Sequence, residues 1–154
     1  QYARPDDLLR APATQFVEDF VGEDRGVKRL QLSTVSRLPY NRGPVVDVTA
    51  DVADARRVLE ENGTRWVGVI EDEVFLGWIH DEDLDGVSLR DVPRAEPAGR
   101  VSPDSTLRNA MEVIMTSHTS TAVIEDEGRF GGVVTLEQLR VALDLDRSAG
   151  PDPR

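Results

Sequence analysis

The sequence predicts an α/β (α+β) protein made of two copies of one small unit, in which two small sheets with flanking helices are related by a pseudo-two-fold axis. The residues from Val69 to Glu73 read VIEDE, and the same five letters recur 54 positions later. Gly77 and Leu84 recur 55 positions later, as Gly132 and Leu139. We infer that one residue was gained between the copies, and that each copy is too small to bury its own apolar face without the other.

The first unit has the order strand, helix, strand, strand, helix. Asp51 is placed to cap the helix and Asn62-Gly63 to end it, while the acidic residues after Ile70 mark a turn between two strands. The predicted elements cover residues 45–48, 52–62, 66–70, 74–79 and 81–85.

The second unit repeats this order. A short strand ends at Val101, Ser102 to Ser105 are expected to cap the next helix, and the apolar residues of that helix recur at helical spacing. Two strands follow at 121–124 and 129–134. A final helix is expected to start at Thr135.

The residues before these units predict helices at 5–10 and 14–21, a short turn or helix at 27–32 and a β-leaning segment at 34–36. The apolar face of 14–21 needs a partner, either in this chain or in a larger neighbour. We expect the chain to divide into a helical segment, two repeats and a flexible tail, at residues 1–38, 39–86, 87–147 and 148–154.

Composition limits the possible functions. Apolar residues make up 39% of the chain and charged residues 31%, and no run approaches the ~20 apolar residues of a membrane span. We therefore expect a soluble, cytoplasmic protein that does not insert into a membrane. Asp and Glu outnumber Lys and Arg by 29 to 18, which disfavours nucleic acid as a partner, although one or two arginines could still hold a small anion. The absence of cysteine excludes disulfides.

The last strand of each unit contains Gly77-Trp78-Ile79 or Gly132-Val133-Val134. A polar residue follows, and after it come two residues, an acid or amide, and Leu. This motif and the order of the elements resemble a tandem CBS (cystathionine β-synthase) pair, or Bateman module, over residues 45–145. Residues 2–25, with Phe-Val-Glu-Asp-Phe-Val-Gly at their centre, are similar to the end of the ATP-binding subunit of osmoprotectant (glycine betaine, carnitine, choline) ABC transporters.

This resemblance implies a regulatory module that forms a homodimer through its CBS pair, and residues 1–38 would be the end of an ATPase domain. Its partners would be that ATPase domain and the transporter permease, at the cytoplasmic face of the membrane. The sequence contains no Gly-x-x-x-x-Gly-Lys-[Ser/Thr] loop, so the chain is not expected to be an enzyme.

Nucleotide-binding members of the family typically carry Thr or Ser, two residues and Asp at the start of the last helix of a repeat. The first repeat has His80 and Asp83 at these places, and the second has Thr135 and Gln138. Because neither motif is complete, AMP or ATP is the less favoured ligand. The resemblance implies cyclic di-AMP, with no required cofactor. A ligand-free dimerisation or ionic-strength-sensing module is the alternative.

If a ligand binds between the repeats, we expect it at equivalent strand ends. Trp66 could stack on a base while Arg65 faces a phosphate, or Trp66 could be a core residue. The hydroxyls of 119–121 could bind phosphate, and Thr135 with Gln138 could equally form a capping box. The candidate ligand-binding residues are Val46, Arg65, Trp66, Val67, Val101, Thr119, Ser120, Thr121, Val133 and Thr135.

The sequence offers no convincing catalytic or metal site. His80 and His118 are single histidines and are interpreted as surface residues. The acidic runs at 71–73, 81–83 and 125–127 lack the spacing and the glycine of a calcium loop, and are interpreted as solvated turns.

Overall fold

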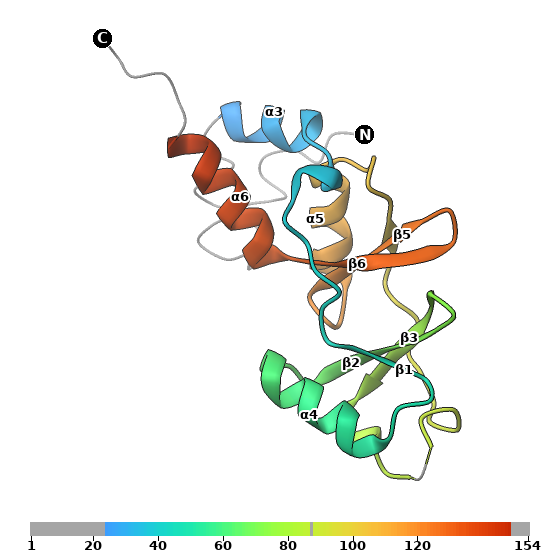
Figure 1. The fold of residues 1–154 in the computed structure, drawn as a ribbon. Coiled ribbons are helices and arrows are strands. Elements are labelled where there is room, and N and C mark those ends of the chain that lie inside the picture. Colours follow the sequence, from blue (N-terminus) through green and yellow to red (C-terminus); the bar gives the residue numbers. More distant parts are fainter. Residues whose placement is uncertain (1–23, 87, 149–154) are drawn as a thin grey trace.

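The computed structural model describes residues 24–86 and 88–148. Figure 1 shows two small sheets one above the other, with helices on their outer sides. The helices predicted at 5–10 and 14–21, and the tail beyond 148, lie outside the described residues. No helix among the described residues is long and apolar enough to cross a membrane.

Each sheet contains three strands, and the first strand is parallel to the second while the second is antiparallel to the third. In the first sheet the order is β1-β2-β3, and in the second it is β4-β5-β6. The strands are β1 Val45–Asp47, β2 Trp66–Glu71, β3 Val74–His80, β4 Arg100–Val101, β5 Thr121–Asp126 and β6 Arg129–Thr135. The helical elements are α3 Asp24–Leu32, η1 Val35–Arg37, α4 Val52–Asn62, η2 Asp81–Asp83, α5 Leu107–Thr116 and α6 Leu136–Ser148.

The helix α4 begins and ends as its sequence predicts. The Asp51 carboxylate accepts the N–H of Asp54 at 2.8 Å, and Gly63 adopts the left-handed conformation that closes the helix. The predicted cap of α5 was wrong. Thr106 is the N-cap, accepting the N–H of Asn109 at 3.1 Å, because residues 102–105 are used in a turn of their own.

The segment predicted as β-leaning at 34–36 is instead a 3₁₀ turn. The N–H groups of Val35 and Ser36 donate to the carbonyls of Ser105 and Pro103, at 2.9 and 2.8 Å, so they are satisfied by the turn before α5 and not by a sheet. A single bridge joins Thr34 to Thr106. The segment is thereby attached to the second repeat, although it precedes the first.

Three apolar clusters form the interior, and no polar or charged residue of the described chain is buried. One cluster lies under α4 and includes Leu89 and Val92, while a second lies around α5 and α6 and includes Leu30, Val35 and Leu38. Side chains therefore cross the predicted chain divisions at 38/39 and 86/87. The division of the chain at those positions stays a prediction.

The third cluster joins the two sheets. Its buried members are Phe75, Trp78, Val123, Phe130 and Val133. The rings of Phe75 and Phe130 stack with centroids 5.6 Å apart, and Trp78 packs edge-on against Phe75 at 5.0 Å. Because Phe75 and Phe130 occupy equivalent places in the two repeats, their stacking marks the pseudo-two-fold axis.

Strand register shows that the repeats are related by an offset of 55 throughout their strands. Val45 pairs with Gly68 and Arg100 pairs with Val123, while Trp66 pairs with His80 and Thr121 with Thr135. The match of VIEDE at 54 was therefore one residue out of register, and no residue was gained between the units. The identical VIEDE sequences gave the wrong offset because the two turns do not fall at the same place within them. The turn of the first repeat lies at Asp72-Glu73 and that of the second at Glu127-Gly128.

Segments before each repeat pair with the sheet of the other. Asn41 bridges to Val133 in β6, and Ala95 bridges to Trp78 in β3. At these places Gly132 and Gly77 have φ of 150° and 141°. A Cβ on Gly77 would lie 3.0 Å from the carbonyl oxygen of Ala95, and one on Gly132 would clash with that of Asn41. The shared glycines are explained by this close backbone approach.

Truncating Phe130 should strongly destabilise the protein. Phe130→Ala removes one of the two stacked rings at the buried interface between the sheets, and we expect a loss of about 3–5 kcal/mol in the free energy of unfolding. Chemical denaturation measures this loss. Val74→Ala is the control, because Val74 is 45% exposed, and it should cost under ~0.5 kcal/mol. A loss for Phe130→Ala no greater than that of the control would contradict the interface described above.

Gly132→Ala tests the crossed pairing. The new Cβ meets the Asn41 carbonyl, so we expect a cost above about 2 kcal/mol and loss of protection of the Val133 amide in hydrogen exchange. Gly86→Ala is matched to it, because Gly86 has a similar φ of 159° and nothing within 4 Å. That control should lose only about 1 kcal/mol through its backbone conformation. Equal costs for the two variants would show that the linker does not approach Gly132.

Candidate ligand-binding clefts

Two equivalent strand ends face the interface between the repeats. In the first repeat the pair at this end is Trp66 and His80, and in the second it is Thr121 and Thr135. Alternation along the strands places these four residues on the same sheet faces as Trp78, Val123 and Val133 of the interface cluster. The two ends therefore have equivalent positions and very different side chains.

Trp66 is half-buried and packs against the interface cluster. Its ring meets that of His80 edge-on, with centroids 4.8 Å apart and an interplanar angle of 74°. The imidazole Nδ1 accepts the N–H of Glu82 at 3.3 Å, which fixes the orientation of His80. Trp66 thus packs against the interior on one side and stays partly exposed at the end of its strand.

Arg65 lies on the other side of the strand from Trp66. Its guanidinium donates to both carboxylate oxygens of Asp81, at 3.0 and 3.1 Å, and to Glu82 at 2.9 Å. Together with Asp81 it lines a cavity of about 380 Å³ beside α4. The structure therefore separates the two groups that were expected to hold a base and a phosphate together. Arg65 is neutralised within its own repeat.

The ion pair also controls the titration of Asp81. The hydrogen bonds from Arg65 hold the pKa of the Asp81 carboxyl below its ordinary value, with the charge of Arg65 adding to the effect. Its pKa is thus lower in the folded than in the unfolded chain, so the pair stabilises the fold above the unfolded pKa and loses this contribution as the pH falls through the folded pKa.

The second cleft end carries a row of hydroxyl groups. The Thr119 hydroxyl lies 2.7 Å from that of Thr121 and 2.8 Å from that of Ser117. Ser120, beside them, has a φ of 54° and is exposed. Hydroxyls can rotate to donate or accept, so this row can exchange its internal hydrogen bonds for bonds to a phosphate or a base edge. Ser117 was not among the predicted site residues.

Thr135 and Gln138 form the capping box that the sequence allowed. The Gln138 amide oxygen accepts the N–H of Thr135 at 2.8 Å, and the Thr135 hydroxyl accepts the N–H of Gln138 at 3.3 Å. The Gln138 side chain, at the position of the Asp in the nucleotide motif, is therefore engaged with the backbone of Thr135, just before α6. A ligand here would meet the start of a thirteen-residue helix.

The predicted valines of the site are mostly core residues. Val46 and Val67 are buried under α4, and Val101 is buried around α5, whereas Val133 lies in the interface cluster. Val45 faces the other repeat in place of Val46. These strands are apolar on both faces, so the sequence did not reveal which alternate residues face the cleft.

One cluster of the described residues has the composition of a cation site. His80, Asp81 and Glu82 each offer an atom within 4.8 Å of the others. Arg65 already donates to both acids, so a cation would have to displace it. His118 lies exposed and away from this cluster.

The pairing of the linkers at Asn41 and Ala95 with β6 and β3, next to the two strand ends, was not predicted. The signal that could have revealed them was the pair Gly77 and Gly132, since a glycine inside a strand often marks the approach of another backbone. Arg42, beside Asn41, places its guanidinium 5.4 Å from the centre of the Phe130 ring.

Two α/β repeats, each with a linker that pairs with the sheet of the other, define the class of paired-repeat modules. The sequence pattern of the CBS domain matches residues 35–90 and 89–145, and the chain belongs to the CBS-domain family. In structure it is similar to the CBS-pair protein CBSX2 of Arabidopsis thaliana, with a TM-score of 0.62 and 22% identity over 74% of this chain and 96% of that one. CBSX2 in complex with AMP is also similar, at a TM-score of 0.58 and 21% identity over 74% of this chain and 98% of that one.

Curated relatives are transport proteins. The carnitine transport ATP-binding protein OpuCA of Listeria monocytogenes is 29% identical over 90% of this chain and 37% of its own length. The osmoprotectant import ATP-binding protein OsmV of Salmonella typhimurium is 26% identical over 96% of this chain and 40% of its own length. The chain thus spans about two fifths of the length of these relatives. The fold also resembles that of Staphylococcus aureus OpuCA, at a TM-score of 0.54 and 19% identity over 70% of this chain and 97% of that one.

Replacing Arg65 should move the titration of Asp81. In Arg65→Met we expect the pKa of the Asp81 carboxyl to rise toward its ordinary value, because the hydrogen bonds that favour its charged form are lost. A pH titration of the carboxyl carbon by NMR measures this. Arg57→Met is the control, because Arg57 pairs with Asp54 and Glu61, and it should leave Asp81 unchanged. An unmoved Asp81 in Arg65→Met would disprove the assigned cause.

Proposed function

We propose that this chain is the ligand-sensing regulatory module of an osmoprotectant ABC importer, and that the ligand it senses is cyclic di-AMP. The ten candidate residues of the sequence analysis remain the proposed region of contact, with the half-buried ring of Trp66 and the hydroxyls of 119, 121 and 135 as its accessible side chains. The buried valines contribute the walls behind them.

The observation that carries the importer assignment is the similarity to osmoprotectant ATP-binding proteins over 90% and 96% of this chain. This similarity includes residues before the CBS pair, so it extends beyond what a shared CBS fold requires. In the proposed whole protein, residues 1–38 join an ATPase domain, and the subunit works with a permease at the cytoplasmic face of the membrane. The chain itself supplies no catalytic group for ATP hydrolysis.

The cleft chemistry supports a ligand other than a simple mononucleotide. A ribose-binding Asp is missing from the second repeat, where Gln138 caps a helix, and the hydroxyl before it is missing from the first, where His80 packs on Trp66. A larger ligand with two adenines and two phosphates can use the different chemistry of the two ends. We propose that this ligand binds to a homodimer of the CBS pair and favours one of two placements of the attached ATPase domains. It can shift that equilibrium by no more than the difference in its binding free energy between the two placements.

A ligand-free sensor of ionic strength is the second candidate, and the net charge of −11 favours it. The contacts between the repeats include an exposed ion pair, from Arg129 to Glu73 at 3.2 Å, which salt would screen. This candidate predicts a response to salt and none to nucleotide.

Thermal shift and calorimetry with cyclic di-AMP, AMP and ATP test the proposal. Cyclic di-AMP at ~100 times its dissociation constant should stabilise the chain by about 2.7 kcal/mol. Thr121→Val should weaken its binding by about tenfold or more, because it removes one hydroxyl donor from the cleft.

Thr34→Val is the matched control, since Thr34 is equally half-buried but lies at the start of the 3₁₀ turn, paired with Ser36. It should bind as the unchanged chain does. A response to AMP or ATP without one to cyclic di-AMP would exclude the proposed ligand, and a response to salt alone would favour the second candidate.

A further inference from the structure

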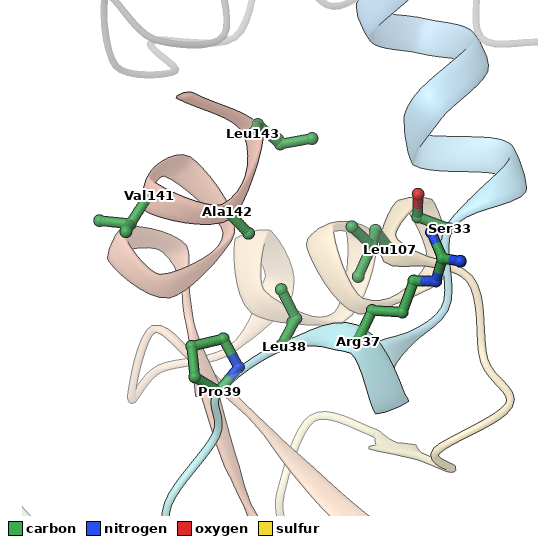
Figure 2. Close-up of a pocket in the computed structure, with 8 residues that line it drawn as sticks. All are labelled: Ser33, Arg37, Leu38, Pro39, Leu107, Val141, Ala142 and Leu143. Carbon is green, nitrogen blue, oxygen red and sulfur yellow. The ribbon is translucent and has the colours of Figure 1, made fainter. Parts of the chain in front are cut away.

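A separate cavity lies where the segment before the repeats meets the second repeat. It has a volume of about 370 Å³, within the size range of sites for small ligands. Figure 2 shows residues of α6 on one side of it, and Leu107 of α5 with Ser33 and Arg37 on the other. The described residues that line it are Ser33, Arg37, Leu38, Pro39, Leu107, Val141, Ala142 and Leu143.

Most of the lining is apolar. Leu38, Leu107 and Leu143 are core residues whose side chains also border the cavity, and Val141 is 39% exposed. Such a surface favours the aliphatic part of a ligand, because its burial removes apolar area from water.

The polar groups gather on one side, at Ser33 and Arg37 (Figure 2). Ser33 is fixed there, because its carbonyl accepts the N–H of Leu107 at 2.9 Å. Its hydroxyl and the Arg37 guanidinium form no hydrogen bond or ion pair within residues 24–86 and 88–148. By contrast, Arg65, Arg90 and Arg100 are all paired with carboxylates.

Arg37 is exposed, and unlike Arg42 and Arg94, which contact a ring and backbone carbonyls, its guanidinium has no partner among the described residues. One guanidinium and one hydroxyl suit a single carboxylate, which accepts bidentate bonds from arginine. Among the described residues of the wall, the others offer no side-chain donors for the sugar or base edges of a nucleotide. The lining therefore selects an anionic head with an aliphatic body.

We propose that this cavity binds a small amphipathic monocarboxylate, with its carboxylate on Arg37 and Ser33 and its aliphatic chain against Leu107 and Leu143. The site is distinct from the clefts between the repeats and does not depend on a nucleotide. It lies between η1 and α6, so its occupant contacts both the segment before the repeats and the last helix.

Titration of the full 154-residue chain with octanoate tests the proposal. We expect saturable shifts of the Leu107 and Leu143 methyl signals in NMR spectra. Octan-1-ol has the same aliphatic body without the charge, and octylammonium has the opposite charge. Both should bind at least tenfold more weakly than octanoate, and octylammonium should be the weakest.

Arg37→Met should weaken octanoate by at least tenfold, equivalent to about 1.4 kcal/mol. Arg129→Met makes the same change at a side chain that is 76% exposed on the hairpin between β5 and β6, and it should leave octanoate binding unchanged. Ser33→Ala, which preserves the backbone contact with Leu107, provides a second variant should Arg37→Met fail to fold, and its affinity should also fall.

The proposal is overturned if octanoate produces no saturable shift, or if octan-1-ol binds equally well. It is also overturned if neither Arg37→Met nor Ser33→Ala lowers the affinity. Nuclear Overhauser contacts between residues 1–23 and the Leu143 methyl groups in the free chain would overturn it as well, because the cavity would then be filled by the protein itself. None of these results depends on whether cyclic di-AMP binds.

Discussion

The structure depends on the burial of two sheet faces against each other. Each three-stranded sheet is covered by helices on one face only, and the other face carries large apolar side chains that water would contact in an isolated repeat. The stacking of Phe75 on Phe130 joins these faces at the pseudo-two-fold axis. This requirement keeps Trp66 partly inside, and it brings the two strand ends with the candidate ligand groups to the edges of one interface.

Much of the fold could be predicted because both repeats carry local signals. The cap at Asp51, the stop at Gly63 and the paired glycines at 77 and 132 each specify a backbone geometry that the structure contains. The register of the repeats could not be predicted from identical letters, since acidic residues are favoured at any exposed turn. The hydrogen-bond pattern around the bulges, between Val69 and Ile70 in the first repeat, decides it.

The positions of the candidate residues at equivalent strand ends were predictable, but the contacts of their side chains were not. The equivalence of Trp66 and Thr121 follows from the repeat, whereas the antiparallel pairing that brings Trp66 beside His80 and Thr121 beside Thr135 was not predicted. The direction of each side chain was not evident, because strands that are apolar on both faces give no alternation. The ion pairs of Arg65 with the Asp81 and Glu82 carboxylates of η2 were likewise not evident from the sequence.

The attachment of α3 and the 3₁₀ turn to the second repeat has a consequence for synthesis on the ribosome. The first repeat can assemble its core from residues 46–92 as soon as they emerge. Leu30, Val35 and Leu38 emerge earlier, but they pack against Leu139 and Leu143, which are made much later. The earliest described part of the chain must therefore wait, with its apolar side chains unprotected, for one of the last. Residues 24–38 are thus made before the repeats but are packed only after the second repeat has been made. Chaperone contact during synthesis would therefore fall on residues 24–38.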